Sequence, residues 1–244
     1  MKKLVLLLTL AVAPALGFAS SALKLDDANI DLKDQASLQR GAKYFVNYCS
    51  GCHSLKYMRY NRLGADLGLS DGQVIKNLMF TGGKMGDSMT IAMRPSDAAG
   101  WFGTAPPDLS VVARSRGVNW LYTYLRSFYL DESRPWGVNN TVFKDVGMPD
   151  VLWQLHGQQK AVYRTETTEH GEHQVLEGLE LVQPGTMSPD EYDNAVRDLV
   201  NFLAYTGEPV KLERQRLGVW VLLFLAVFFV IAYLLKKEYW KDVH

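Results

Sequence analysis

The chain has few cysteines and no net charge, and both observations restrict the classes of protein to which it can belong. Its 244 residues include two cysteines, which excludes a domain held together by a framework of structural disulfides. Lys and Arg number 26, as do Asp and Glu, so the formal net charge is zero. No internal repeat is present. With 48% hydrophobic residues, a chain of this length can still build one substantial core.

The zero net charge conceals an uneven distribution along the chain. Residues 23–210 carry 18 Lys and Arg against 23 Asp and Glu, a net charge of −5. The two flanking segments carry 8 basic against 3 acidic residues. Basic ends beside apolar runs suit contact with membrane lipid, and an acidic body suits a basic soluble partner. We expect no nucleic-acid partner.

Residues 1–22 have the pattern of a secretory signal peptide. Lys2 and Lys3 precede the nine-residue apolar run Leu4–Val12, which is too short to span a bilayer. Small residues follow, and cleavage after Ala19 or after Ala22 fits the small-residue rule. The alternative is an N-terminal anchor that is retained.

A second apolar run, Leu217–Leu235, has 19 residues without a charge. A helix of this length measures about 28 Å, close to the thickness of the hydrocarbon core of a bilayer. Arg216 precedes the run and Lys236 follows it, and aromatic residues lie toward both ends. We therefore predict a single span at about 217–235. If residues 1–22 direct export, the body lies in the bacterial periplasm and the C-terminus in the cytoplasm.

The pattern predicts a mainly α-helical protein with a signal peptide at 1–22, an exported domain at 23–210 and an anchor at 211–244. Hydrophobic spacing predicts four helices in the exported domain, and Ser188 begins a capping box for the last of them. Loops are predicted at 82–110 and 131–152, where turn-forming residues gather, and a hairpin or irregular excursion at 162–183. The predicted helices cover 38–48, 69–80, 119–129 and 188–205, and a linker covers 208–216.

Both cysteines lie in one pentapeptide, Cys49-Ser50-Gly51-Cys52-His53. Thiols at positions i and i+3 of a helical turn project to one side, where they can form thioethers to the two vinyl groups of a haem. His53 follows directly and can bind the iron from one axial side. A redox disulfide of the thioredoxin type is the alternative, but the histidine favours covalent haem c, and hence an electron carrier.

The other axial position of the iron has several candidate ligands. A thioether ligand raises the reduction potential relative to a second histidine. Met148 stands out because Gly147 allows a close backbone approach and Pro149 fixes the loop. Met93, just before Pro95, is the second choice. The remaining candidates are Met58, Met79, Met85, Met89, Met187, His156, His170 and His173, although most methionines only fill cores and His156 is expected to be a satisfied surface or core histidine.

Haem propionates are carboxylates and need hydrogen-bond donors. Arg114 and Arg116 lie just before the predicted aromatic helix, and either can serve. An ordinary surface role for each arginine is the alternative.

Several motifs together resemble the cytochrome c1 family, the haem subunit of bacterial ubiquinol–cytochrome c reductase. They are the export signal, CSGCHSLKYMRYNRL, APPDLSVVARSRG with the aromatic segment behind it, VGMPDVLW and the single C-terminal span. The resemblance implies a class I cytochrome c-like domain with long insertions. It implies Cys49 and Cys52 as thioether attachments, and His53 and Met148 as iron ligands. It further implies that Pro106 and Pro107 line the haem and that Arg116 contacts a propionate. This chain has Asp150 where mitochondrial members have a second proline.

The resemblance also implies a place in an electron-transfer chain. The chain would not be an enzyme alone but a subunit of a proton-translocating ubiquinol:cytochrome c oxidoreductase. It would take one electron from the Rieske iron–sulfur protein, lie beside cytochrome b in a dimeric complex of the inner membrane, and reduce a soluble or membrane-tethered cytochrome c.

Two other functions fit the haem motif. A different membrane-anchored c-type cytochrome could feed a terminal oxidase or reductase, although many of those are anchored at the N-terminus. A haem-based sensor would need an open or labile sixth position. Separately, the carboxylates between Glu166 and Glu180 form either part of a docking face or a solvated hairpin.

Overall fold

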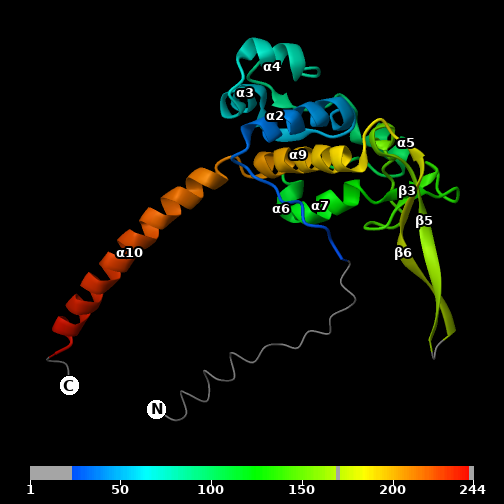
Figure 1. The fold of residues 1–244 in the computed structure, drawn as a ribbon. Coiled ribbons are helices and arrows are strands. Elements are labelled where there is room, and N and C mark those ends of the chain that lie inside the picture. Colours follow the sequence, from blue (N-terminus) through cyan, green and yellow to red (C-terminus); the bar gives the residue numbers. More distant parts are fainter. Residues whose placement is uncertain (1–23, 169–170, 242–244) are drawn as a thin grey trace.

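The computed structural model describes residues 24–168 and 171–241. The predicted signal peptide lies outside these residues. Figure 1 shows a helical body from which a long C-terminal helix and a β-hairpin project in different directions. About half of the described chain is helical, in the elements α2 (Gln35–Tyr44), η1 (Phe45–Cys49), α3 (Tyr60–Leu67), α4 (Asp71–Asn77), α5 (Pro95–Phe102), α6 (Val112–Ser115), α7 (Val118–Leu125), α8 (Trp153–His156), α9 (Pro189–Gly207) and α10 (Lys211–Tyr239).

The described strands form three separate two-stranded antiparallel sheets. Two of them are short and fasten loops of the body, whereas the third is the projecting hairpin. The strands are β1 (Leu55–Arg59) with β2 (Ser88–Met89), β3 (Phe128–Leu130) with β4 (Val138–Asn140), and β5 (Gly157–Thr168) with β6 (Gly171–Pro184).

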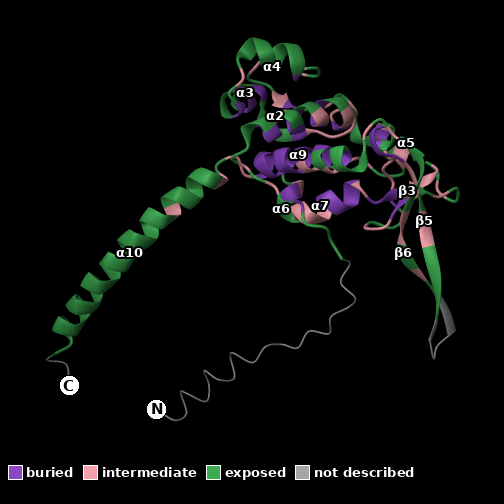
Figure 2. Cartoon of the chain, in the orientation of Figure 1, coloured by how far each residue is buried: buried purple, intermediate pink, exposed green. Residues whose placement is uncertain are grey.

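Helix α9 is the centre of the body. It lies between α2 on one side and α6 with α7 on the other (Figure 1). The predicted capping box begins it: Ser188 Oγ accepts from the Glu191 N–H, and the Glu191 carboxylate accepts from the Ser188 N–H. Most of its residues from Tyr192 onward are buried, and Figure 2 shows buried residues concentrated on α9, α2 and α7.

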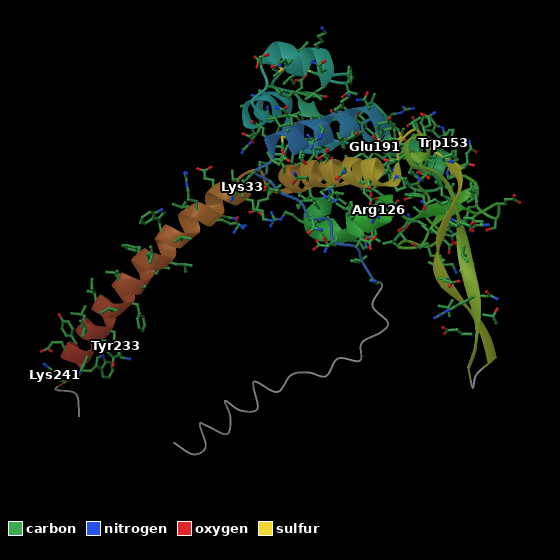
Figure 3. All side chains as sticks on the ribbon, viewed as in Figure 1. Lys33, Arg126, Trp153, Glu191, Tyr233 and Lys241 are labelled. Atoms are coloured by element: carbon green, nitrogen blue, oxygen red, sulfur yellow. The ribbon has the colours of Figure 1, made fainter. Side chains whose placement is uncertain are left out.

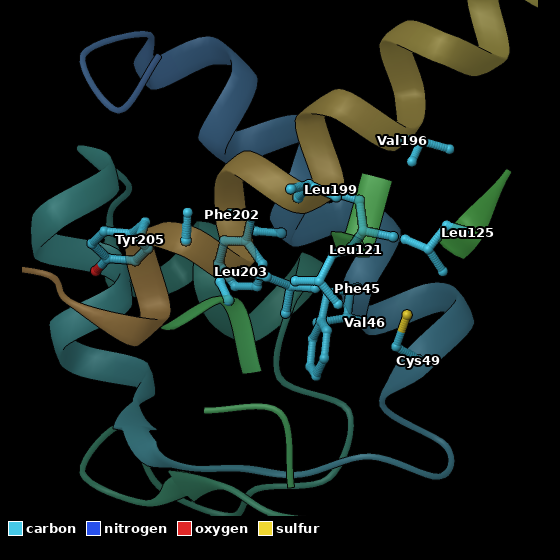
Figure 4. Close-up of a cluster of buried hydrophobic side chains, with 14 of the residues drawn as sticks. Phe45, Val46, Cys49, Leu121, Leu125, Val196, Leu199, Phe202, Leu203 and Tyr205 are labelled. Atoms are coloured by element: carbon cyan, nitrogen blue, oxygen red, sulfur yellow. The ribbon is translucent and has the colours of Figure 1, made fainter. Parts of the chain in front are cut away.

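Helices α2 and α9 cross at a glycine. A Cβ atom added at Gly41 would lie 2.1 Å from the Asp198 carbonyl oxygen, so the two backbones are almost in contact. Beside this contact Arg40 Nε lies 2.5 Å from Asp198 Oδ2, and the Phe45 and Phe202 rings are 5.8 Å apart. The close-up in Figure 4 shows Cys49 at the margin of the same apolar cluster. The helix crossing therefore positions the start of the haem motif against the core.

An N-terminal strap, residues 24–34, ties these helices together from outside. The Asp26 N–H donates to Thr123 Oγ1 and the Ala28 N–H donates to Asn119 Oδ1, both on α7. From α9, Arg197 donates to the Ala28 carbonyl and Asn201 to the Asp31 carbonyl. The strap thus connects α7 to α9 through its backbone.

The predicted hairpin is confirmed and is longer than the sequence suggested. Strands β5 and β6 pair from Gly157↔Pro184 to Thr168↔Gly171, with two bulges. One face carries the exposed pair Lys160 and Glu180, whose Nζ and Oε2 atoms are 3.0 Å apart. Surface pairs of this kind add little stability. The hairpin is attached to the body at its base, where β5 packs against β3.

Helix α10 is long and apolar enough to cross a membrane, with a mean hydropathy of 2.8 over its best window and no burial there. In Figure 3 its side chains, Tyr233 among them, point outward along a helix that stands apart from the body. The helix starts at Lys211, so most of the linker predicted at 208–216 is helical.

Three local predictions are wrong. The segment 82–110 is not all loop, because it contains β2 and α5. The predicted loop at 131–152 contains β4. The aromatic helix ends at Leu125 rather than near Tyr129, because Phe128–Leu130 pairs with Val138–Asn140 as β3. The short strands depend on tertiary pairing, which overrides local periodicity. Helix α5 instead begins locally, with Pro95 in its first turn.

The close crossing of α2 and α9 gives a stability prediction. Gly41→Ala should lower the free energy of unfolding by about 3 kcal/mol, because the new methyl group meets backbone that cannot move aside. Thermal unfolding of the detergent-solubilised chain, followed by circular dichroism, measures the effect. The matched control is Gly100→Ala on α5, where a Cβ meets nothing within 4 Å and should stabilise by about 0.5–1 kcal/mol. Equal melting temperatures for Gly41→Ala and wild type would contradict the prediction.

Candidate haem site

The two cysteines lie at the end of a helix that widens before it stops. After α2 the chain makes the π-helical turn η1, in which the Ser50 N–H donates to the Phe45 carbonyl over 3.0 Å. The N–H groups of Cys52 and His53 then both donate to the Cys49 carbonyl. Cys49 is buried and Cys52 is half-buried, and they form no disulfide. Burial raises the pKa of the Cys49 thiol to about 12, so this thiol is neutral.

The His53 ring is held by one hydrogen bond from outside the motif. Its Nδ1 lies 2.7 Å from the carbonyl oxygen of Pro107. A carbonyl oxygen can only accept, so Nδ1 carries the proton and Nε2 keeps its lone pair. Such an outer bond fixes both tautomer and ring orientation in metal-ligating histidines. Burial lowers the pKa of His53, which also favours the neutral ring that binds metals.

The segment that supplies this carbonyl is attached to the haem motif at several points. The Leu109 N–H donates to the Ser54 carbonyl, and the Lys56 N–H donates to Asp108 Oδ2, each over 2.9 Å. Pro107 therefore lies beside His53, and its place against the haem, with that of Pro106, stays a prediction. Its carbonyl orients the histidine, a role that sequence reasoning did not anticipate.

Met148 is half-buried against the core, and its sulfur has a hydrogen-bond donor. The O–H of Tyr124, on α7, lies 3.4 Å from Met148 Sδ. Desolvation by burial raises the pKa of Tyr124, so the phenol remains a donor. Gly147 allows close packing here, because a Cβ at this position would lie 3.3 Å from the Phe102 carbonyl oxygen.

The loop after Met148 is clamped by a buried pair. His156 Nε2 lies 2.9 Å from Asp150 Oδ2, and both side chains are at least nine-tenths buried. The His156 ring packs on Tyr192 of α9, with ring centroids 4.7 Å apart. Nδ1 of His156 has no partner within the part of the chain that the structure describes. The pair thus fastens the Met148 loop to α9.

The rival axial ligands lie in different surroundings. Met58 and Met89 are buried in the hydrophobic core, and Met79, Met85 and Met187 pack against it. Met93 is half-buried, just before α5. His156 is buried and its Nε2 is paired with Asp150, which agrees with the expected satisfied core histidine. Only its Nδ1 has no partner among the described residues. The side chains of His170 and His173 lie outside the described part of the chain.

Arg116 is exposed and lies against two aromatic rings. Its guanidinium carbon is 5.2 Å from the centre of the Trp120 ring and 5.9 Å from that of Phe143. The Arg114 side chain instead lies against the end of α9, where a Cβ at Gly207 would meet its Cγ at 3.3 Å. Contact of either arginine with a propionate stays a prediction.

These side chains fit a covalently attached haem. Two unjoined thiols stand one helical turn apart, and the adjacent imidazole has Nδ1 engaged, with no hydrogen bond to Nε2 from the residues that the structure describes. Residues 27–243 match the sequence profile of the Cytochrome C1 family. The chain belongs to the cytochrome c1 family. Cytochrome c1 carries a covalently bound haem c, so the predicted cofactor is confirmed.

The curated relatives agree over most of their length. The chain is 57% identical to cytochrome c1 of Allochromatium vinosum, over the whole of both proteins. It is 30% identical to cytochrome c1 of Rhodospirillum rubrum, covering 86% of this chain and 83% of that one. It is also 49% identical to a Nitrosomonas europaea protein named ammonia monooxygenase gamma subunit, covering 98% and 97%. Cytochrome c1 is a subunit of the bc1 complex, where it works with cytochrome b and the Rieske protein.

The Asp150–His156 clamp gives a prediction for the Met148 loop. In His156→Phe the ring can still pack on Tyr192, but the buried Asp150 carboxylate loses its side-chain partner and keeps only the Leu152 N–H. We expect a loss of about 1–3 kcal/mol in stability and release of the Met148 loop below the melting temperature of the body. With Met148 as the predicted thioether ligand, the weak long-wavelength absorption band of thioether-ligated ferric haem, recorded during heating, would report that release. The control is Lys160→Ala, which removes an exposed ion pair and should change neither the stability nor the band. If the band is as stable to heating in His156→Phe as in wild type, the Asp150–His156 pair does not hold the Met148 loop.

Proposed function

We propose that this chain carries single electrons from the Rieske iron–sulfur protein to a cytochrome c. The observation that supports this most is the state of His53. Its ring is fixed through Nδ1 by the Pro107 carbonyl, which leaves the Nε2 lone pair available for a metal, and it directly follows the second of two unjoined thiols in the sequence. Electron transfer by a haem requires neither a nucleophile nor a proton donor from the protein.

Each residue of the site has one proposed role. Cys49 and Cys52 attach the haem as thioethers, and His53 Nε2 and Met148 Sδ bind its iron. The bound haem supplies a one-electron Fe(III)/Fe(II) couple, and a thioether ligand gives that couple a high potential. Pro106 and Pro107 line the haem, and Arg116 contacts a propionate.

The proposed location follows from the two ends of the chain. Residues 1–22 direct export and are cleaved, so the haem domain, residues 23–210, lies in the periplasm. The segment 211–244 anchors it in the inner membrane, with a span at about 217–235 in contact with lipid and the C-terminus in the cytoplasm. The apolar, unburied surface of α10 supports the membrane span.

The acidic body supports a basic electron acceptor, soluble or membrane-tethered. Its net charge of −5 over residues 23–210 would speed encounter with a basic cytochrome c at low ionic strength. We propose that the complex is dimeric, as in the family that the sequence resembles. The carboxylates along β5 and β6, such as Glu166, Glu177 and Glu180, are exposed, which suits either a docking face or a solvated hairpin.

The axial assignment predicts the effect of Met148→Leu. Loss of the thioether should abolish the long-wavelength absorption band, lower the reduction potential and open the iron to carbon monoxide. Met93→Leu is the matched control and should leave the spectrum and potential unchanged. Should Met93→Leu lose the band while Met148→Leu keeps it, the axial ligand is Met93.

The electron route can be tested in right-side-out spheroplasts. Ubiquinol should reduce the haem only when the Rieske protein is present, and an added membrane-impermeant basic cytochrome c should reoxidise it. Reoxidation only after lysis would mean that the haem domain faces the cytoplasm, which would contradict the proposed periplasmic location. Copurification with cytochrome b and the Rieske protein supports the assignment, whereas copurification with a terminal oxidase or an ammonia-oxidising enzyme would overturn it.

A further inference from the structure

The phenol of Tyr124 is directed at the sulfur of Met148. The O–H···Sδ distance is 3.4 Å, and Tyr124 is 9% exposed. Among the described residues, Met148 Sδ is the only hydrogen-bond partner recorded for this hydroxyl. A buried phenol normally satisfies its O–H with an oxygen acceptor, since a thioether is a weak acceptor. The choice of sulfur here therefore calls for a functional explanation.

Tyr124 is held from several directions, so its hydroxyl has little freedom to turn away. Trp120, one turn earlier on α7, stacks on the Tyr124 ring at 4.9 Å and 9°. Phe128 meets the ring edge-on, with centroids 5.3 Å apart. The Asn140 amide donates to the Tyr124 carbonyl over 2.8 Å.

The same amide side chain also fixes the loop that leads to Met148. Asn140 Oδ1 accepts from the N–H groups of Val142 and Phe143, over 2.9 and 3.1 Å. Donor and acceptor of the O–H···S bond thus belong to segments that Asn140 joins. This arrangement keeps the bond in place without relying on the weak acceptor strength of sulfur.

We propose that Tyr124 is a positioning residue that donates its O–H to Met148 Sδ and thereby raises the reduction potential of the site. The inference rests on the proposed role of Met148 as an iron ligand. A thioether sulfur has two lone pairs, of which ligation uses one, and the phenol engages the other. A hydrogen bond to the sulfur reduces its donation of electron density, which disfavours the ferric state more than the ferrous state.

The test is a potentiometric titration of the full-length, detergent-solubilised protein with Tyr124→Phe, which keeps the ring and removes the hydroxyl. One neutral hydrogen bond changes the reduction equilibrium by roughly three- to tenfold, so the midpoint potential should fall by about 30–60 mV at 59 mV per tenfold. The long-wavelength band should persist at a shifted position. A ring-fluorinated tyrosine at position 124, with the same shape and a stronger donor, should shift the potential upward.

Tyr205→Phe provides the matched control. The Tyr205 hydroxyl lies 4.0 Å from Met58 Sδ and donates to Asp66 Oδ2 over 2.8 Å, so this variant also removes a phenol O–H beside a methionine. It should lower stability and leave the potential unchanged. An equal shift in Tyr205→Phe would mean that Tyr124 has no specific effect and would overturn the inference.

The outcomes separate this inference from the axial assignment. An unchanged potential in Tyr124→Phe with the band intact refutes the role of Tyr124 and leaves Met148 as the ligand. A long-wavelength band that survives in Met148→Leu refutes the assignment of Met148 as the axial ligand, and the Tyr124 inference with it. If Tyr124→Phe does not accumulate, the fluorinated tyrosine decides alone, because an unchanged potential there also refutes the inference.

Discussion

The contact between α2 and α9 at Gly41 is the constraint on which the rest of the body depends. Because no side chain separates the two backbones, Arg40 reaches Asp198 and Phe45 packs on Phe202. Those contacts set the direction in which the chain leaves α2 through η1, and hence where Cys49 and His53 lie. Helix α9 also carries Tyr192, which supports the Asp150–His156 clamp. One helix therefore supports both candidate ligand segments, although they are far apart in the sequence.

Around that helix the site is assembled from loops held by polar contacts. The histidine is oriented by a carbonyl from the 106–110 segment, and the methionine is contacted by a phenol from α7. Asn140 and Asp150 then attach the methionine loop at two further points. Each tether is weak alone, at about 1 kcal/mol net, but together they leave little freedom at the ligand positions. A rigid site suits electron transfer, since small geometric change between oxidation states keeps the barrier low.

The amino-acid sequence was sufficient to predict those features whose signal lies within one continuous segment. The pentapeptide at 49–53, the capping box at Ser188 and the apolar run at 217–235 can each be recognised from one continuous segment of the sequence. Met148 was chosen as the axial candidate because glycine and proline flank it, and that assignment stays a prediction. The family followed from combining such motifs, and the matching family profile agrees.

What could not be predicted depends on residues that meet only in the folded chain. The Pro107 carbonyl is invisible in a pattern of side chains, because every residue has one. Tyr124 lies in a run of aromatics, and spacing cannot tell a core phenol from one that donates to sulfur. His156 was expected to be satisfied, but its partner Asp150 and its unpartnered Nδ1 depend on how the loop meets α9. The short strand β3 was missed for the same reason, because it exists through its pairing with β4.

The order of segments along the chain has a consequence for biogenesis. The Arg40–Asp198 contact joins residues 158 positions apart, so the core around Cys49 cannot close until the chain has been made as far as α9. Under the proposed export, α9 must also cross the membrane first, and both thiols would stay open to haem attachment until then. Because α10 begins only a few residues after α9, completion of the core and arrest of that translocation would nearly coincide. A topology that places the partner helix last thus leaves time for a covalent modification that the finished core would obstruct.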